Sequence, residues 1–392
     1  MRIGIVGKPN VGKTTFFNAI TLAHAEVGEY PFTTIKPNRG ITSVRVNCVC
    51  KEFNVECNPR FGSCEDGIRL VPTTIIDVAG LVPDAHKGKG LGNQFLNDLS
   101  RAKALIHVVD ISGSTDSEGN PCEAGRNDPL SDITFLEKEI DMWFLSILEK
   151  EWKKILRRSK LKKEKIEDLI HEKMSGVGVT RENVMDAMKN MEDDCESWDS
   201  DKLFEFVSNL RKLSMPIVIS ANKIDLPHGE ENFKKIEKKG IKLIPTCAEA
   251  ELALRRASEQ KLIKYSPGDN HFEIIGDLEE KQRAALKFIE KLIRKWNGTG
   301  VQQCIDYVVK DVLSFIPVFP VEDENKLTDK DGNVLPDVFL MPKGSRAIDL
   351  AYNIHTEIGE GFICGIDVRT KKRVGKDYQL KEGDVIKIIT EK

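Results

Sequence analysis

The chain has 392 residues, of which 40% are hydrophobic and 31% are charged. Such a length predicts roughly two to three domains with cores of their own. Its 59 basic and 62 acidic residues give a net charge of −3, which excludes a globally basic coat for nucleic acid. No apolar run approaches the ~18 residues of a membrane span, and the N-terminus has the pattern of a strand rather than a signal peptide. We therefore expect a cytoplasmic protein.

The first motif occupies residues 7–14 and directly follows the apolar run 3–6. Its letters GKPNVGKT fit the phosphate-loop pattern G-x-x-x-x-G-K-[ST] between a strand and a helix. Glycines let backbone N–H groups turn toward a phosphate, and the helix N-terminus adds positive partial charge. Lys13 is expected to neutralise phosphate charge during catalysis and Thr14 to bind Mg²⁺. The expected nucleotide-binding residues of this loop are Gly7, Asn10, Val11, Gly12, Lys13, Thr14 and Thr15.

A second motif, the letters NKID at residues 222–225, follows the apolar strand 217–219. The carboxylate of Asp225 offers only acceptors, which match the two adjacent donors of guanine and leave adenine unpaired. Asn222, Lys223 and Asp225 therefore predict a site for GTP and GDP. We expect the chain to prefer GTP to ATP.

A third motif, DVAG at residues 77–80, follows the predicted strand 73–76. On its own this pattern is too common to carry weight. After a phosphate loop, however, Asp77 would hold Mg²⁺ and the N–H of Gly80 would sense the γ-phosphate during hydrolysis.

The order of these motifs, with YPFTT at 30–34 and KGLGN at 89–93, resembles the Obg family of GTPases, nearest its YchF-related branch. The resemblance implies that Thr34, or Thr33 beside it, reaches Mg²⁺ when GTP is bound. The stretch 246–249 resembles the fifth guanine motif, which would place Cys247 and Ala248 against the base.

Three further expectations come from the same resemblance. Leu81 stands where Ras-like enzymes carry the glutamine that orients water, so slow hydrolysis must take polar assistance from elsewhere. Asn10 stands where related GTPases place a K⁺ ligand. Many proteins of the YchF branch have a degraded base motif and use ATP, whereas the intact motif here favours GTP.

The chain is expected to have an α/β fold. The P-loop GTPase domain would comprise residues 1–136 and 214–315, interrupted by a helical, coiled-coil-like insertion at 137–213. Apolar residues spaced by three and four predict one long amphipathic helix from about Ile140 to about Lys173. The insertion also carries a basic run, which is either a solvated helix face or an RNA contact: Lys153, Lys154, Arg157, Arg158, Lys160, Lys162, Lys163 and Lys165.

Residues 316–392 are expected to form a separate small domain. The pattern predicts strands at 338–341, 362–368 and 384–389, and a helix that Ser345 caps and Gly359 ends. These segments resemble a TGS domain, which has a ubiquitin-like β-grasp fold. A basic loop at 371–376 is as consistent with a solvated turn as with a contact to RNA.

Nine cysteines occur without a secretory signal, so reduced thiols are the default. Four of them, Cys48, Cys50, Cys57 and Cys64, lie within seventeen residues. They could bind Zn²⁺, form one or two disulfides, or remain free core thiols. The spacing lacks the paired C-x₂-C knuckles typical of zinc sites.

Two classes of function remain open at this point. The first is a GTP-hydrolysing switch that acts on ribosomes or structured RNA. The second is a nucleotide-sensing RNA- or ribosome-binding protein with negligible turnover, which Leu81 keeps open. A P-loop kinase for small molecules is a third and weaker alternative, because the guanine motif would then have no role. We expect neither membrane nor DNA as a partner.

Overall fold

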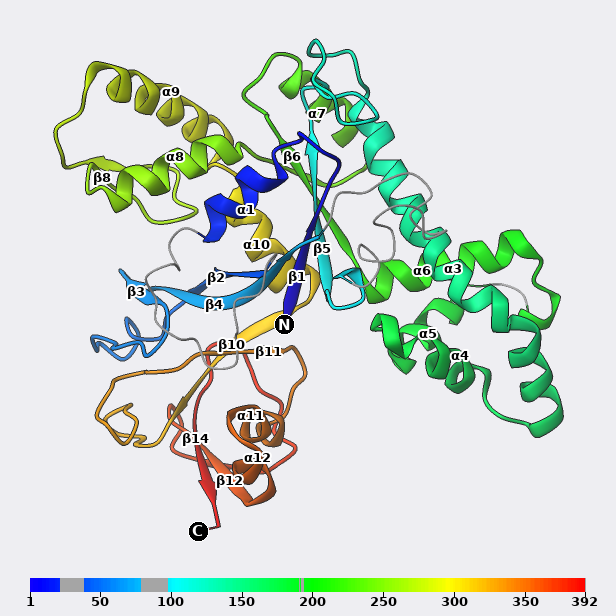
Figure 1. The fold of residues 1–392 in the computed structure, drawn as a ribbon. Helices are drawn as coiled ribbons and strands as arrows, with labels where there is room; N and C mark the ends of the chain where they lie inside the picture. Colours follow the sequence, from blue (N-terminus) through cyan, green and yellow to red (C-terminus); the bar gives the residue numbers. More distant parts are fainter. Residues whose placement is uncertain (22–38, 79–97, 190, 192–193, 392) are drawn as a thin grey trace. The chain divides into compact units, whose positions relative to one another are not determined.

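A computed structural model describes residues 1–21, 39–78, 98–189, 191 and 194–391 (Figure 1). Within these residues the chain forms two compact units. The first contains residues 1–21, 39–40, 74–78, 98–189, 191 and 194–304, and the second contains residues 41–73 and 305–391. Residues 41–73, which sequence analysis assigns to the GTPase domain, therefore belong to the same compact unit as the C-terminal strands.

The main sheet has seven strands, and its order is β2-β4-β1-β5-β6-β7, with β3 added beside β4. The strands are β1 (Arg2–Val6), β2 (Arg39–Asn47), β3 (Ser63–Glu65), β4 (Ile68–Asp77), β5 (Ala104–Asp110), β6 (Ile217–Asn222) and β7 (Leu243–Pro245). β1 runs parallel to β4 and β5, and β5, β6 and β7 are parallel in turn. All seven residues of β5 are buried, as expected for a parallel strand covered on both faces.

The parallel strands have their carboxyl ends at one edge of the sheet. The helices that follow them in the chain are α1 (Lys13–Thr21) after β1, α7 (Gly229–Glu237) between β6 and β7, and α8 (Ala248–Glu259), α9 (Glu280–Trp296) and α10 (Val301–Tyr307) after β7, the last continued by a π-helical turn at Val308–Val312. A small two-stranded sheet of β8 (Ile263–Lys264) and β9 (Glu273–Ile274) lies between α8 and α9 in the chain. α1 packs against α8, so the helix after the phosphate loop contacts the helix that begins in the predicted fifth guanine motif.

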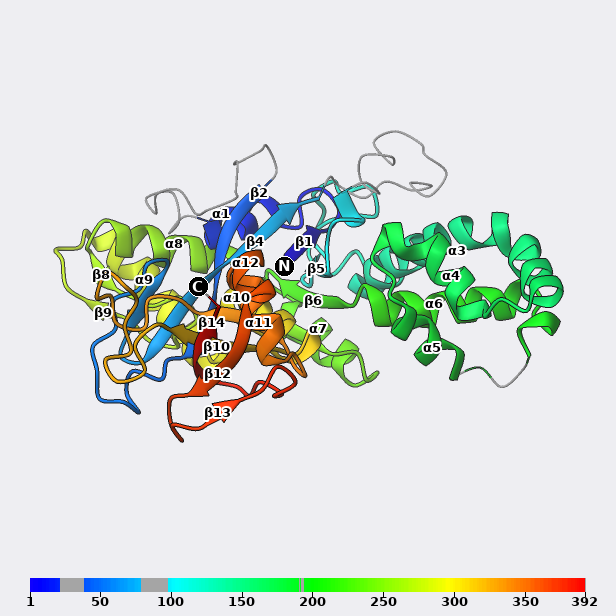
Figure 2. The same ribbon diagram turned by 90° about the horizontal axis from the view of Figure 1, so that it is seen from below.

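Between β5 and β6 the chain forms a helical lobe, seen side-on in Figure 2. Its helices are α3 (Pro129–Lys162), α4 (Ile166–Met174), α5 (Arg181–Lys189) and α6 (Ser200–Ser214), with 3₁₀ turns at Ser175–Val177 and Cys195–Ser197. The prediction of a single helix to about Lys173 was wrong. The backbone of Lys163 is left-handed, which ends α3 and lets α4 fold back against it.

Apolar and ionic contacts hold this lobe together. The rings of Trp152 and Trp198 are stacked, with centroids 5.6 Å apart and planes 5° from parallel. Inside the lobe, Arg211 Nε donates to Asp141 Oδ1 at 2.7 Å, and both side chains are at most 8% exposed. The apolar core of the lobe is continuous with that of the main sheet, because Leu136 and Ile140 belong to the same buried cluster as Val6 and Leu105.

The second unit contains a five-stranded mixed sheet in the order β11-β10-β14-β12-β13. Its elements are β10 (Phe315–Val321), β11 (Phe339–Pro342), α11 (Ala347–Ile354), α12 (Thr356–Glu360), β12 (Phe362–Asp367), β13 (Arg373–Val374) and β14 (Val385–Thr390). β10 and β14 are parallel neighbours at the centre, and α11 contacts β11 and β12. This is a β-grasp arrangement.

The predicted helix between residues 345 and 359 differs from the structure in two respects. Its cap is Arg346, whose N–H donates to Asp349 Oδ2 at 2.7 Å, rather than Ser345. His355 adopts an extended backbone and splits the segment into two helices, so Gly359 lies inside α12 instead of ending a helix.

The core of the second unit joins residues far apart in the sequence. Cys48, Val49 and Cys50 pack in one apolar cluster with Phe319, Val321, Leu327, Leu335, Val368 and Val385. The Arg69 guanidinium, 1% exposed, donates to the carbonyl oxygens of Leu335 and Pro336 at 3.1 and 2.7 Å. Residues 41–73 thus complete the hydrophobic core of the C-terminal sheet.

Candidate nucleotide-binding site

The phosphate loop leaves the buried strand β1 and enters α1 at Lys13. Gly12 has φ +93°, and a Cβ there would lie 2.3 Å from Asn222 Nδ2. Only glycine fits, because a side chain would both strain the backbone and displace Asn222. The second glycine of the motif therefore allows β6 to approach the loop.

Asn222 is the link between the phosphate motif and the base motif. It is 3% exposed at the end of β6. Its Nδ2 donates to Val11 O at 2.8 Å, and its Oδ1 accepts from the N–H of Ala248 at 3.0 Å. One side chain thus joins the phosphate loop to the start of α8, where sequence analysis expects the fifth guanine motif.

Lys13, the first residue of α1, lies beside Asp77, the last residue of β4. Lys13 Nζ is 2.7 Å from Asp77 Oδ1, and the two side chains are 15% and 23% exposed. The Thr14 side chain is exposed and that of Thr15 half-buried. One predicted phosphate residue, Lys13, is therefore in contact with one predicted magnesium residue, Asp77, and the carboxylate balances the charge of the lysine.

The base motif borders an open groove of about 630 Å³. Asp225 lines this groove with Leu226, His228 and Trp296. The neighbouring Cys247 is buried, and burial followed by the negative charge of Asp225 raises the pKa of its thiol. Cys247 therefore stays protonated and adds no charge beside Asp225.

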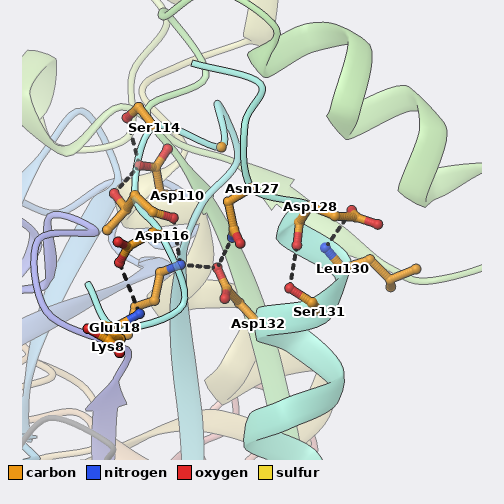
Figure 3. Close-up of polar contacts among 12 residues, drawn as sticks. Lys8, Asp110, Ser114, Asp116, Glu118, Asn127, Asp128, Leu130, Ser131 and Asp132 are labelled. Carbon is orange, nitrogen blue, oxygen red and sulfur yellow. Dashed lines mark hydrogen bonds and ion pairs between the residues drawn. The ribbon is translucent and has the colours of Figure 1, made fainter. Parts of the chain in front are cut away.

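A polar network around Asp110, at the end of β5, was missed by the sequence analysis. Asp110 accepts a hydrogen bond from the hydroxyl group of Ser114 (Figure 3). It also accepts from the hydroxyl groups of Ser112 and Thr115 and from Lys223 Nζ at 2.8 Å. Burial alone would raise the pKa of Asp110, but these hydrogen bonds outweigh it and lower the pKa. The signal available was a carboxylate at a strand end followed by three hydroxyl residues.

The loop after β5 also contacts the phosphate loop. Lys8 Nζ lies 2.6 Å from Asp132 Oδ2 and donates to Thr115 O at 2.8 Å (Figure 3). Asn10 Nδ2 donates to Gly119 O at 2.9 Å. This loop therefore fixes the orientation of Asn10.

Family models match three segments of the chain. Residues 2–156 match a 50S ribosome-binding GTPase model, and residues 220–323 match the Obg-like GTPase YGR210-like, G4 motif-containing domain. Residues 326–390 match the TGS domain.

Relatives match over almost the whole length. An uncharacterised GTP-binding protein of Methanocaldococcus jannaschii is 50% identical, covering 99% of this chain and 98% of the relative. The ribosome-binding ATPase YchF of Bacillus subtilis is 30% identical, covering 98% and 97%. The chain belongs to the YchF branch of the Obg-like GTPases. The expected family and the expected α/β fold with a TGS domain are thereby confirmed.

Solved structures share the fold of this YchF-type chain. The GTP-binding protein of Pyrococcus horikoshii has a TM-score of 0.78 and 41% identity, and the match covers both chains completely. The YchF GTPase of Schizosaccharomyces pombe has a TM-score of 0.59 and 21% identity, covering 99% of this chain and 97% of that one.

Several predicted residues of the YchF site lie outside the described residues. These are Thr33, Thr34, Gly80 and Leu81. In the described part of the chain, no helix is long and apolar enough to cross a membrane.

The four clustered cysteines of this YchF-type chain are separate from the nucleotide-binding residues in the fold. Cys48, Cys50, Cys57 and Cys64 belong to the second unit, and their sulfur atoms all lie within 4.8 Å of one another. A hydrogen bond from Cys64 lowers the pKa of Cys48 to about 5, whereas burial raises the pKa of Cys50 to about 11. The sulfur atoms are therefore close enough to affect one another's protonation.

Proposed function

We propose that this protein binds GTP with Mg²⁺, hydrolyses it slowly to GDP and phosphate, and uses the difference between the two states to act on the ribosome or another structured RNA. The observation that carries the nucleotide part is the position of Asn222. Its buried amide, which belongs to the base motif, hydrogen-bonds both to Val11 in the phosphate loop and to Ala248 in the predicted fifth guanine motif. The same buried amide would therefore hold in place both the residues that bind the phosphate groups and those that bind guanine.

The residues at the phosphate loop are arranged so that they could bind an anion. Lys13 Nζ forms an ion pair with Asp77 Oδ1 at 2.7 Å. When the nucleotide binds, the γ-phosphate would replace Asp77 as the partner of Lys13. Asp77 would then be released toward the metal, with Thr14, whose side chain is exposed, as the second protein ligand. Mg²⁺, when bound, supplies positive charge that offsets the charge developing on the phosphate oxygens.

The residues at and beside the base motif support a preference for GTP over ATP. Asp225 lines an open groove next to a buried, protonated Cys247. Its carboxylate would accept from the two adjacent donors of guanine, whereas adenine would leave it unpaired. Discrimination of at least a hundredfold is expected. A competition titration of GTP against ATP tests this, and equal affinities would contradict it.

Slow turnover follows from the chemistry next to the γ-phosphate. Leu81 cannot orient a water molecule, and unassisted switch GTPases are already slow. We expect at most about one turnover per minute, accelerated by K⁺ over Na⁺ if Asn10 Oδ1 binds the ion. A single-turnover assay with Lys13→Ala as control separates this function from the alternative, a nucleotide sensor without turnover.

The RNA part of the proposal is supported by the relatives' names and by surface charge. The Bacillus subtilis relative is a ribosome-binding ATPase. In the helical lobe, Lys153, Arg157, Lys162, Lys163 and Lys165 are exposed. In contrast, Arg158 is held by Glu164 and Glu172 at 2.5 and 3.1 Å, so it is less available for phosphate contacts.

Cosedimentation with ribosomes tests this surface. Replacing Lys153, Arg157 and Lys163 by Glu should weaken binding strongly and reduce its salt dependence, because each phosphate contact contributes to the salt slope. Arg158→Gln is the matched control and should change binding little. Undiminished binding of the triple variant in both GTP-like and GDP states would contradict the proposed RNA surface.

A further inference from the structure

The cysteine cluster is independent of the nucleotide chemistry, and its four residues come from three parts of one loop. Cys48 and Cys50 are buried in the turn after β2, Cys57 lies in the following loop, and Cys64 is in β3. Gly62, with φ +75°, allows the loop to return: a Cβ there would lie 2.0 Å from Leu70 O. This reversal brings Cys64 back to the two buried cysteines.

The distances between the sulfur atoms are those of a tetrahedral metal site. Cys48 Sγ and Cys57 Sγ are 4.0 Å apart, Cys50 Sγ and Cys64 Sγ are 3.9 Å apart, and all four lie within 4.8 Å. Zn–S bonds of ~2.3 Å at tetrahedral angles require sulfur separations of ~3.8 Å. A disulfide would need ~2.05 Å, and a polynuclear iron–sulfur cluster would hold its thiolates further apart.

The charge around the cluster also fits a metal thiolate. Arg69 is paired directly with Cys64 across the β3–β4 ladder, so their side chains lie on the same face of the sheet. Its guanidinium is 1% exposed and donates to the Leu335 and Pro336 carbonyls. Those carbonyls accept hydrogen bonds but carry no charge, and a buried charge is costly without a counter-charge. The carboxyl group of Asp337 interacts with the Arg69 charge, and a metal thiolate would add further negative charge. A zinc ion with four thiolates has a net charge of −2.

We propose that Cys48, Cys50, Cys57 and Cys64 bind one structural zinc ion, which fixes the loop of residues 48–64 as the surface on which the C-terminal β-grasp sheet packs. Cys48, Val49 and Cys50 are members of the apolar cluster that includes Phe319 and Val385. The metal would hold these residues in place for that contact. Since four protein ligands close the coordination sphere, the role is structural and not catalytic.

The test is metal analysis of the full-length protein purified without chelator. We expect about one zinc per chain and, after exchange with Co²⁺, the visible absorption of a tetrahedral thiolate site. The Co²⁺ spectrum of the unsubstituted protein needs no variant and therefore does not depend on whether a variant folds. A chain without metal that gives no such spectrum, with four reactive thiols or two disulfides instead, would overturn the proposal.

Variants locate the site within the chain. Cys57→Ser and Cys64→Ser should each reduce the bound zinc to less than about a tenth and lower the unfolding temperature. Cys364→Ser, a half-buried cysteine of the same unit in β12, is the matched control and should retain one zinc. Equal zinc content in all three variants would overturn the assignment of the ligands. Affinity for GTP should be unchanged, since the nucleotide residues belong to the other unit.

Discussion

The nucleotide site and the cysteine-bearing unit are built in different ways. The nucleotide site uses motifs that each occupy a few consecutive residues at strand ends, and the parallel sheet brings them to one edge. The second unit joins residues 41–73 to residues 305–391, through contacts such as Arg69 with Leu335 that span 266 positions. Function that depends on chemistry can thus be recognised in local patterns, whereas a packed interface between distant segments leaves no such pattern.

The strongest test of this difference is removal of residues 316–392. The deletion would expose the apolar face formed by Cys48, Val49 and Cys50, so we expect the second unit to lose its whole stability, about 5 kcal/mol or more. Hydrogen exchange should show lost protection in residues 41–73 and retained protection in residues 104–110. Protection of both segments would mean that residues 41–73 fold without the C-terminal sheet.

Asp225→Asn tests the nucleotide site alone. The amide can donate to the C2 carbonyl of xanthine, so preference should move from GTP toward xanthosine triphosphate by roughly four powers of ten. Competition titrations measure the shift. Glu230→Gln, a carboxylate that lines the same groove, is the control and should keep GTP preference. If Asp225→Asn also kept it, the base-reading role would be wrong.

Arg69→Met tests the second unit alone. The variant leaves the buried carbonyls of Leu335 and Pro336 without their charged donor, which should cost about 3 kcal/mol of unfolding free energy. Urea denaturation measures this loss. Arg60→Met, which removes a half-exposed partner of Asp329, should cost much less. GTP affinity should stay within about twofold for both variants, and a larger change would indicate coupling between the two regions.

The smallest effect is expected at the Glu52–Arg369 ion pair, whose closest atoms are 2.6 Å apart and whose side chains are 51% and 31% exposed. A double-mutant cycle should give at most about 1 kcal/mol, decreasing with salt. The hydrogen bond from Arg369 lowers the pKa of Glu52 below its ordinary 4.5. The stabilisation should therefore be complete above about pH 4.5 and disappear as the pH falls through the lowered pKa. A coupling energy independent of pH would contradict the ionic origin.

The sequence predicted the family, the α/β fold and the TGS segment because phosphate loops, base motifs and strand patterns are local. It did not predict the Asn222 bridge, since the letters NKID specify a ligand but not a contact with Val11. The break at Lys163 was missed because the amphipathic pattern continues through it, and nothing in a lysine signals a left-handed backbone. Sequence analysis assigns residues 41–73 to the GTPase domain, and their strands do pair in the main sheet. Their packing with residues 305–391 was not predicted, because it joins segments that no local pattern links.

The separation between the two segments of the second unit also affects how the protein is made. During translation, Arg69 emerges from the ribosome 266 residues before Leu335. At the usual rate of elongation this interval lasts roughly 10 to 50 seconds. During that time the parallel sheet can begin to form, while the apolar face around Val49 has no partner. The second unit must therefore finish folding after nearly all of the chain has emerged, and this face is where a nascent chain would need protection from aggregation.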